Sequence, residues 1–167
     1  MTQTSHIAAC FGGELPDTFA DVELYAYVDQ GSEPPRYYPF GDFNLTDGED
    51  VREYFSPWSQ EHVAIFMGDG DGHHYGFWRQ PGRALVDCSV VFLGNEGEQE
   101  VIAGDLDEFL ALAAWGMTEY LCADGVTWML EEDEQPGDPE PFFKEQRIRR
   151  CPDPARLIAE AAAAYPL

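Results

Sequence analysis

The sequence predicts an α+β fold, with a mainly antiparallel sheet and helices packed on one side of it. Between residues 62 and 115, short apolar runs meet Gly/Asp/Asn-rich turns and re-emerge as second runs, which is the pattern of β-hairpins. An amphipathic helical pattern follows the second pair of runs. A chain of 167 residues suits one hydrophobic core, so we expect a single domain over residues 1–167.

The first third of the chain predicts strands and one short helix. Residues 22–28 alternate apolar and polar side chains, which indicates a half-buried strand, and residues 37–43 suit a short edge strand. The run Thr46-Asp47-Gly48-Glu49 fits a capping box, in which the hydroxyl and the carboxylate satisfy free backbone donors at a helix start. Pro57 limits that helix to a few turns.

The middle of the chain predicts two hairpins and a helix. The expected strands are Val63–Met67, Tyr75–Trp78, Ser89–Leu93 and Glu100–Ala103, with turns at Gly68–Gly72 and Gly94–Gly97. Asp105 then suits a helix N-cap, with Glu108 three residues later. The apolar stripe of this helix comprises Leu106, Phe109, Leu110, Ala113 and Met117.

The last third predicts a strand, a loop and a final helix. Residues 126–130 suit a strand, and residues 131–140 hold six acids with Pro and Gly, which is typical of an exposed loop. A C-terminal helix is expected over 153–165, with Asp153 as its N-cap and Pro154 at its first position.

The charge balance constrains the kind of partner. Nine basic against 32 acidic residues give a net charge of −23. Such a surface repels nucleic acid and anionic lipid, because both are bound through Lys and Arg, and it attracts a basic protein. No apolar run approaches the roughly 20 residues that span a bilayer. The alternative is an acidity that serves solubility alone.

The cysteines and the N-terminus indicate a location. The four cysteines, Cys10, Cys88, Cys122 and Cys151, lie far apart without a CxxC pair, which favours buried thiols in a reducing compartment. The first residues show neither a basic region nor a long apolar region of a signal peptide. We therefore expect a cytoplasmic protein.

The sharpest cluster of reactive side chains is Asp69, Asp71, His73 and His74. Carboxylates and imidazoles at this spacing could ligate a metal, and Asp-Gly-Asp-Gly is similar to the opening of a calcium loop. That loop also needs a distal Glu, which is absent at the required end. Because Asp-Gly supplies turn conformations at little cost, a hairpin turn is the favoured interpretation, and no metal or cofactor is predicted.

Other candidates for a functional site are weaker. Cys88 or Cys122 could pair with His62 or His74 as a nucleophile and base, but a buried inert thiol is the commoner outcome. Trp58 lies in a Ser-Pro-Trp-Ser segment, where an exposed aromatic would anchor a protein interface. The acidic run Glu131, Glu132, Asp133 and Glu134 could steer a basic partner.

The segments IFMGDGDGHHYGFW and VVFLGNEGEQEVIAGDLDEFLALA, within residues 62–115, resemble the SMI1/KNR4 (SUKH) superfamily. The resemblance implies a non-enzymatic binding domain. Many bacterial members of that family are immunity proteins, which bind a cognate toxin, often a nuclease or a deaminase, and block it inside the cell.

The expected function is therefore that of an immunity protein that occludes the active site of a basic toxin domain. Its partner-binding residues would be the Asp69/Asp71/His73/His74 cluster, Trp58 and the 131–134 run. Two alternatives stay open: a small metal-dependent hydrolase that uses the cluster, and an acidic scaffold or regulatory module.

Overall fold

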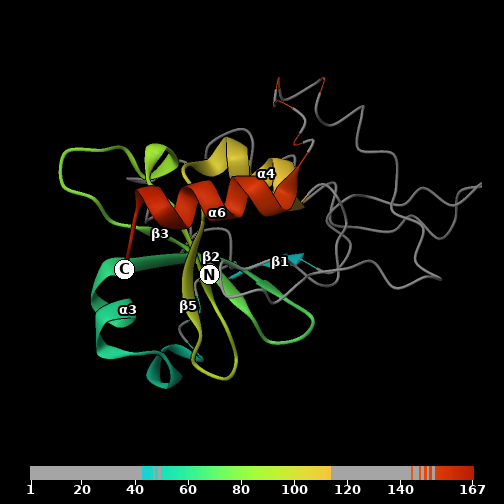
Figure 1. The fold of residues 1–167 in the computed structure, drawn as a ribbon. Coiled ribbons are helices and arrows are strands. Elements are labelled where there is room, and N and C mark those ends of the chain that lie inside the picture. Colours follow the sequence, from blue (N-terminus) through green and yellow to red (C-terminus); the bar gives the residue numbers. More distant parts are fainter. Residues whose placement is uncertain are drawn as a thin grey trace, which may run out of the picture.

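A five-stranded antiparallel sheet forms the centre of the molecule (Figure 1). The computed structural model describes residues 43–46, 48, 50–113, 144, 147, 149, 151 and 153–167. The strands are β1 (Phe43–Leu45), β2 (Val63–Asp69), β3 (His74–Trp78), β4 (Val90–Leu93) and β5 (Gln99–Ala103). Each strand pairs with the next one along the chain, so the sheet is a meander.

Five helical segments accompany the sheet in the described part of the chain. They are the α-helices α3 (Pro57–His62), α4 (Leu106–Ala113) and α6 (Pro154–Ala164), and the 3₁₀-helices η1 (Arg52–Tyr54) and η2 (Leu85–Asp87). The α+β class and the antiparallel sheet are thus confirmed. Both predicted hairpins, β2–β3 and β4–β5, form with strand ends within two residues of those expected.

One face of the sheet is aromatic and lies against α4. Phe66 and Phe77 stack with their ring centroids 4.5 Å apart. Phe109 of α4 meets Phe66 edge-on, with centroids 5.4 Å apart. Tyr75 and Phe92 contact each other in the same cluster, and Tyr75 also contacts Phe109. Aromatic pairs of this geometry stabilise a core beyond the burial of their area.

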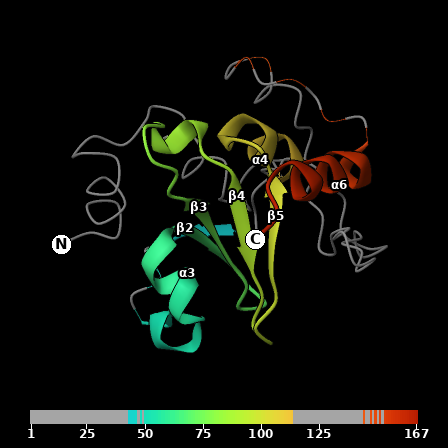
Figure 2. The same ribbon diagram turned by 60° about the vertical axis from the view of Figure 1, so that its left-hand side comes forward.

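The opposite face is aliphatic and lies against α3 and α6. Val91 and Val101 of the sheet form a buried cluster with Ala161 of α6, and Trp58 of α3 packs against the same cluster. Figure 2 shows α3 and α6 at opposite ends of the sheet. The helices therefore pack on both faces, although one side was expected. The reason lies in β4: all four of its residues are buried, so both its faces need cover.

The predicted N-caps of α4 and α6 are confirmed. Asp105 Oδ1 accepts a hydrogen bond of 2.9 Å from the backbone N–H of Glu108, and Glu108 Oε2 accepts one of 2.7 Å from Gly104 N. Asp153 Oδ1 accepts a bond of 3.0 Å from Arg156 N, and Pro154 takes the first helical position. These side chains satisfy backbone donors that have no partner within a helix.

The predicted helix start at Thr46 is wrong. The Thr46 hydroxyl accepts a hydrogen bond of 3.1 Å from Gly48 N, two residues later, which makes a local turn. Gly48 has φ +65, and an added Cβ there would lie 2.6 Å from Ile65 Cδ1. The chain therefore bends against β2 at Gly48, and residues 52–54 form only the 3₁₀-helix η1.

The first α-helix of the described residues begins instead at Pro57, which was expected to end one. Ser56 is its N-cap and accepts a hydrogen bond of 3.1 Å from Ser59 N. A proline at the first helical position costs no hydrogen bond, because that N–H has no partner within the helix. The hydroxyls of Ser56 and Ser59 also donate to Gln99 Oε1, which ties α3 to the start of β5.

Several predictions fall outside the described residues and stay predictions. They are the strands at 22–28 and 126–130, residues 37–42 of the expected edge strand, Cys10, Cys122, Met117 and the acidic loop 131–140 with Glu131, Glu132, Asp133 and Glu134. Phe43, the last residue of the expected edge strand, is the first residue of β1.

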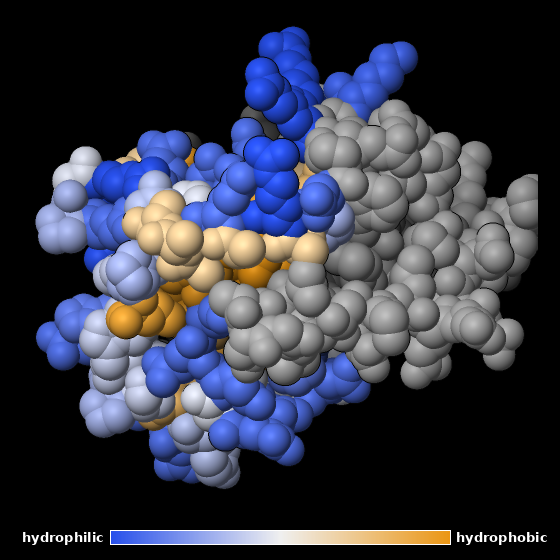
Figure 3. All heavy atoms as spheres, in the orientation of Figure 1, coloured by the Kyte–Doolittle hydropathy of each residue, from blue (hydrophilic) through white to orange (hydrophobic). Residues whose placement is uncertain are grey.

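The described residues present a mostly hydrophilic face in the view of Figure 3. Figure 3 shows polar residues over much of this face, apart from an apolar band along α6. Within the described residues, no helix combines the length and the apolarity that crossing a bilayer requires.

Candidate functional site

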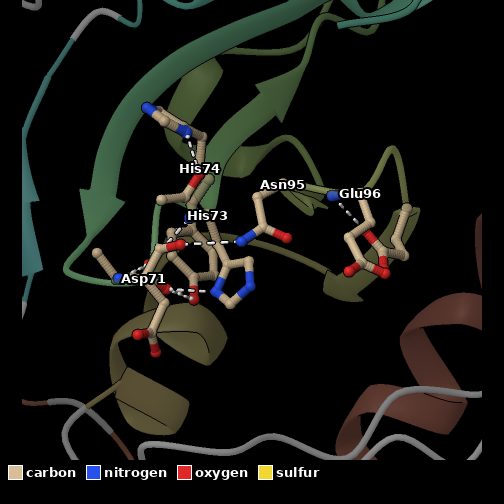
Figure 4. A network of polar contacts seen from close by, with 9 residues as sticks. Asp71, His73, His74, Asn95 and Glu96 are labelled. Atoms are coloured by element: carbon tan, nitrogen blue, oxygen red, sulfur yellow. Dashed lines mark hydrogen bonds and ion pairs between the residues drawn. The ribbon is translucent and has the colours of Figure 1, made fainter. Parts of the chain in front are cut away.

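The Asp69 carboxylate, at the end of β2, organises the β2–β3 turn. Its side chain is only 8% exposed. Oδ1 accepts hydrogen bonds from the backbone N–H groups of Asp71 at 3.1 Å and His73 at 2.9 Å. Oδ2 lies 3.0 Å from His73 Nδ1 and accepts a bond of 3.0 Å from the Tyr75 hydroxyl. The predicted turn thus contains a largely buried carboxylate that two backbone N–H groups, one imidazole and one phenol approach. Figure 4 shows the polar contacts around Asp71 and His73 in this turn.

The two adjacent histidines point to opposite faces of the sheet (Figure 4). The His73 ring lies on the aromatic face, 5.1 Å from the ring of Phe92 between centroids. The His74 ring lies on the other face, with Nδ1 3.1 Å from Gly72 O and its centroid 5.4 Å from that of Phe55. Side chains that alternate in this way along a strand cannot converge on one ion.

The acid–base properties of the cluster follow from these contacts. Burial raises the pKa of Asp69, but the hydrogen bonds and charge of His73, helped by Tyr75, outweigh it and hold that pKa below its usual value. The bond to Asp69 raises the pKa of His73, against partial burial. Burial lowers the pKa of His74. The pKa values of these two neighbouring imidazoles are therefore shifted in opposite directions, upward for His73 and downward for His74.

The β4–β5 turn lies beside the β2–β3 turn. Asn95 Nδ2 donates a hydrogen bond of 3.0 Å to the backbone oxygen of Asp71, across 24 positions of sequence. Glu98 Oε2 accepts a bond of 3.2 Å from Glu96 N within the same turn. Asp71, Glu96 and Glu98 are exposed. The two turns thus bring three exposed carboxylates to one end of the sheet.

This arrangement is poorly suited to metal-dependent hydrolysis. A catalytic metal needs carboxylate oxygens and imidazole nitrogens that point into a common open space. Here four donors of its own hairpin approach the Asp69 carboxylate, and His74 lies on the other face. In the described part of the chain, no group of three or more His, Cys, Asp or Glu side chains is placed to hold a metal ion.

Trp58 lies apart from the cluster. It belongs to helix α3 rather than to a loop and is half-buried, with its ring centroid 5.6 Å from that of Trp78 and 5.5 Å from that of His62. Trp78 pairs with Val63 at the start of β2, whereas Asp69 is at its end. Six residues of strand separate these points by about 20 Å. Trp58 and the cluster therefore do not form one site.

The described cysteines have the surroundings of structural thiols. Cys88 is fully buried, and its thiol lies 3.3 Å from Ala84 O, to which it donates. Cys151 is also buried, and burial raises the pKa of its thiol, which disfavours the reactive thiolate.

Three residues of this region were missed in the sequence. Tyr75 bonds to Asp69, Asn95 joins the two turns, and Glu98 contributes charge beside His73. One indication was available for Tyr75, because it follows His73 by two positions and therefore shares its face of the strand. No local pattern places Asn95 beside Asp71.

The comparisons with known proteins give no further indication. No protein-family model, no curated protein and no solved structure matches the chain.

Proposed function

We propose that this chain is a non-enzymatic protein-binding domain of the SMI1/KNR4 type that neutralises a basic toxin domain by occluding its active site. The observation that carries the proposal is the net charge of −23. A toxin that degrades or modifies nucleic acid needs a cationic cleft for phosphates, and an acidic protein can fill that cleft in place of the substrate.

The placement of the acids at the two turns supports this function. Asp71, Glu96 and Glu98 are exposed on turns that a hydrogen bond from Asn95 holds together. Carboxylates on well-ordered turns lose little conformational entropy when they meet Arg or Lys. Close charge pairs of this kind contribute several kcal/mol of coupling in some protein complexes, about 1.5–7 kcal/mol. We therefore assign the first contacts with the partner to these turns.

The bonding of Asp69 supports a binding role over a hydrolytic one. Its carboxylate accepts hydrogen bonds from its own hairpin, so it serves the shape of the turn. Asp71, by contrast, presents its carboxylate to solvent. In this proposal Asp69 shapes the turn, and the exposed acids around it contact the partner.

The test is protection and binding against a candidate partner, namely the basic C-terminal domain of a large secreted protein encoded beside this chain. Co-expression should restore growth of cells that produce the domain. Calorimetry should show a tight complex that added salt weakens, because the contacts are ionic. Failure to protect against, or to bind, any such neighbouring domain contradicts the proposal.

Matched variants locate the surface. The turn variant Asp71→Asn/Glu96→Gln/Glu98→Gln should lose at least tenfold in affinity. The control Glu53→Gln/Asp87→Asn/Asp107→Asn removes the same charge from exposed positions elsewhere and should lose less than about threefold, the scale of a long-range charge effect. Equal losses in both variants would show that total charge, and not the turns, carries recognition.

A further inference from the structure

The His73 ring packs on Phe92 of β4, with the two ring centroids 5.1 Å apart, and contacts the Asp69 carboxylate of its own turn. Its Nδ1 is 3.0 Å from Oδ2 of Asp69, which closes its own turn. Asp71 of the same turn and Glu98 of the β4–β5 turn lie close enough to act on its charge. Its side chain is 21% exposed, so water screens the interaction of the imidazole with these carboxylates less than it would at a fully exposed site. His73 is thus the basic group within an acidic end of the sheet.

We propose that His73 is a proton-controlled counter-ion: when it is protonated it holds the two acidic turns together, and when it loses its proton it loosens them and leaves their negative charge uncompensated. The device consists of the Asp69–His73 contact, the Asn95–Asp71 bond and the Glu98 carboxylate. The device needs no ligand and no partner, so its test is independent of the proposed function.

The groups around His73 set the sign of the effect. From β2 and its turn, Asp69 and Asp71 favour the imidazolium, as does Glu98 from the β4–β5 turn. Phe92 of β4 contributes a ring without charge. His74 of β3 is the adjacent basic group, and it lies on the opposite face. The three carboxylates together raise the pKa of His73 by more than the partial burial of its ring lowers it.

The stability of the protein then depends on pH in a defined window. The pKa of His73 is raised above its usual 6.5 in the folded state. Its stabilising contribution is therefore complete below pH 6.5 and is lost as the pH rises through the higher, folded-state value. His74 has the opposite sign: its pKa is lowered by burial, so its contribution is complete above 6.5 and is lost as the pH falls.

The direct test is an NMR titration of the imidazole Cε1–H signals in the intact chain between pH 4.5 and 9. The midpoint of His73 should lie above 6.5 and that of His74 below it. Glu98→Gln, an exposed change that leaves the Asp69 contact in place, should lower the midpoint of His73 and leave that of His74 unchanged. A His73 midpoint at or below 6.5, or one that Glu98→Gln does not move, overturns the proposal.

A second measurement follows the coupling of the turns. His73→Asn keeps a donor for Asp69 without a titrating group, and His74→Asn is the matched control. Urea unfolding should show that the unfolding constant of the parent chain rises with pH above 6.5, by at most tenfold per pH unit for one proton. That rise should disappear in His73→Asn and persist in His74→Asn. Because amide exchange is base-catalysed in every chain, the expected result is a rise of the Asn95 side-chain exchange rate with pH that is steeper in the parent chain and in His74→Asn than in His73→Asn. Identical pH profiles in all three chains contradict the device.

Discussion

The β2–β3 and β4–β5 turns lie side by side at one end of the sheet and are built from the same kinds of residue, Gly with Asp, Asn or Glu. In the β2–β3 turn, Asp69 N donates a hydrogen bond of 3.1 Å to His73 O, and Gly72 N donates one of 3.3 Å to Asp69 O. This turn has a side chain in addition: the Asp69 carboxylate, 8% exposed, accepts bonds from backbone and side-chain donors of the loop. Hydrogen bonds of this kind are costly to break, because their acceptor is a charged group that is largely shielded from water.

The β4–β5 turn has the same backbone bonds without a buried carboxylate. Gly97 takes φ +97, and its N–H donates a bond of 3.2 Å to Gly94 O. Gly94 N in turn bonds to Glu98 O at 2.9 Å, and the carboxylate of Glu98 is exposed. The two turns thus share a backbone pattern, including a glycine at positive φ, Gly72 in one and Gly97 in the other. They differ in the Asp69 carboxylate, which only the β2–β3 turn has, and the variants below measure what that carboxylate adds.

The largest effect should come from Asp69→Ala. This change leaves the Tyr75 hydroxyl and the donors of the loop without their acceptor, and we expect the free energy of unfolding to fall by about 3 kcal/mol. Urea denaturation at pH 6 measures the loss. Asp71→Ala is the control, because its exposed carboxylate makes none of these bonds, and it should change stability by less than about 0.5 kcal/mol. Equal losses would show that the buried carboxylate does not close the turn.

A smaller loss should follow Gly97→Ala. A residue with a Cβ is strained at φ +97, so we expect a loss of about 1–2 kcal/mol. Gly70→Ala in the other turn is the matched control: Gly70 has no positive φ, and an added Cβ there meets nothing within 4 Å. Thermal unfolding of both variants checks this. A Gly70 variant as unstable as the Gly97 variant would contradict the assignment of the loss to positive φ, which in the β2–β3 turn belongs to Gly72 (φ +89) and not to Gly70.

The contact between the turns should matter less than either turn. Asn95→Ala removes one hydrogen bond of 3.0 Å at an exposed site, which is expected to cost about 0.5–1 kcal/mol. We also expect faster backbone amide hydrogen exchange in both turns, because without this bond each turn can open independently of the other. Asn95→Asp is informative as a second variant, because it lacks the donor and adds charge beside Asp71. If it were as stable as the parent chain, the bond would have no role.

The smallest effect should be that of Glu98→Gln on stability. The amide oxygen can still accept from Glu96 N, and the side chain is exposed, so we expect a change within about 0.5 kcal/mol at pH 6. The same variant should nevertheless move the titration of His73. Urea denaturation measures the stability of the variant, and NMR on the same sample measures the titration of His73. A loss above 1 kcal/mol would mean that Glu98 closes its turn as Asp69 closes the other.

The sequence was most informative where structure depends on near neighbours. The starts of α4 and α6 were predictable because Asp105 and Asp153 bond to backbone groups three residues away. Thr46 shows the limit of that approach. The same local pattern that caps a helix also makes a turn, and the packing of Gly48 against Ile65 decided between them.

The sequence by itself determined the two hairpins, the helices that follow them and the acidity, because alternation, turn residues and caps act over a few positions and charge is a sum. More than half of the acidic residues lie outside the described ranges. The tertiary structure alone decided that helices cover both faces of the sheet, that Asp69 is buried, and that Asn95 reaches Asp71. Those features depend on strand register and on packing between distant segments, which no local pattern encodes.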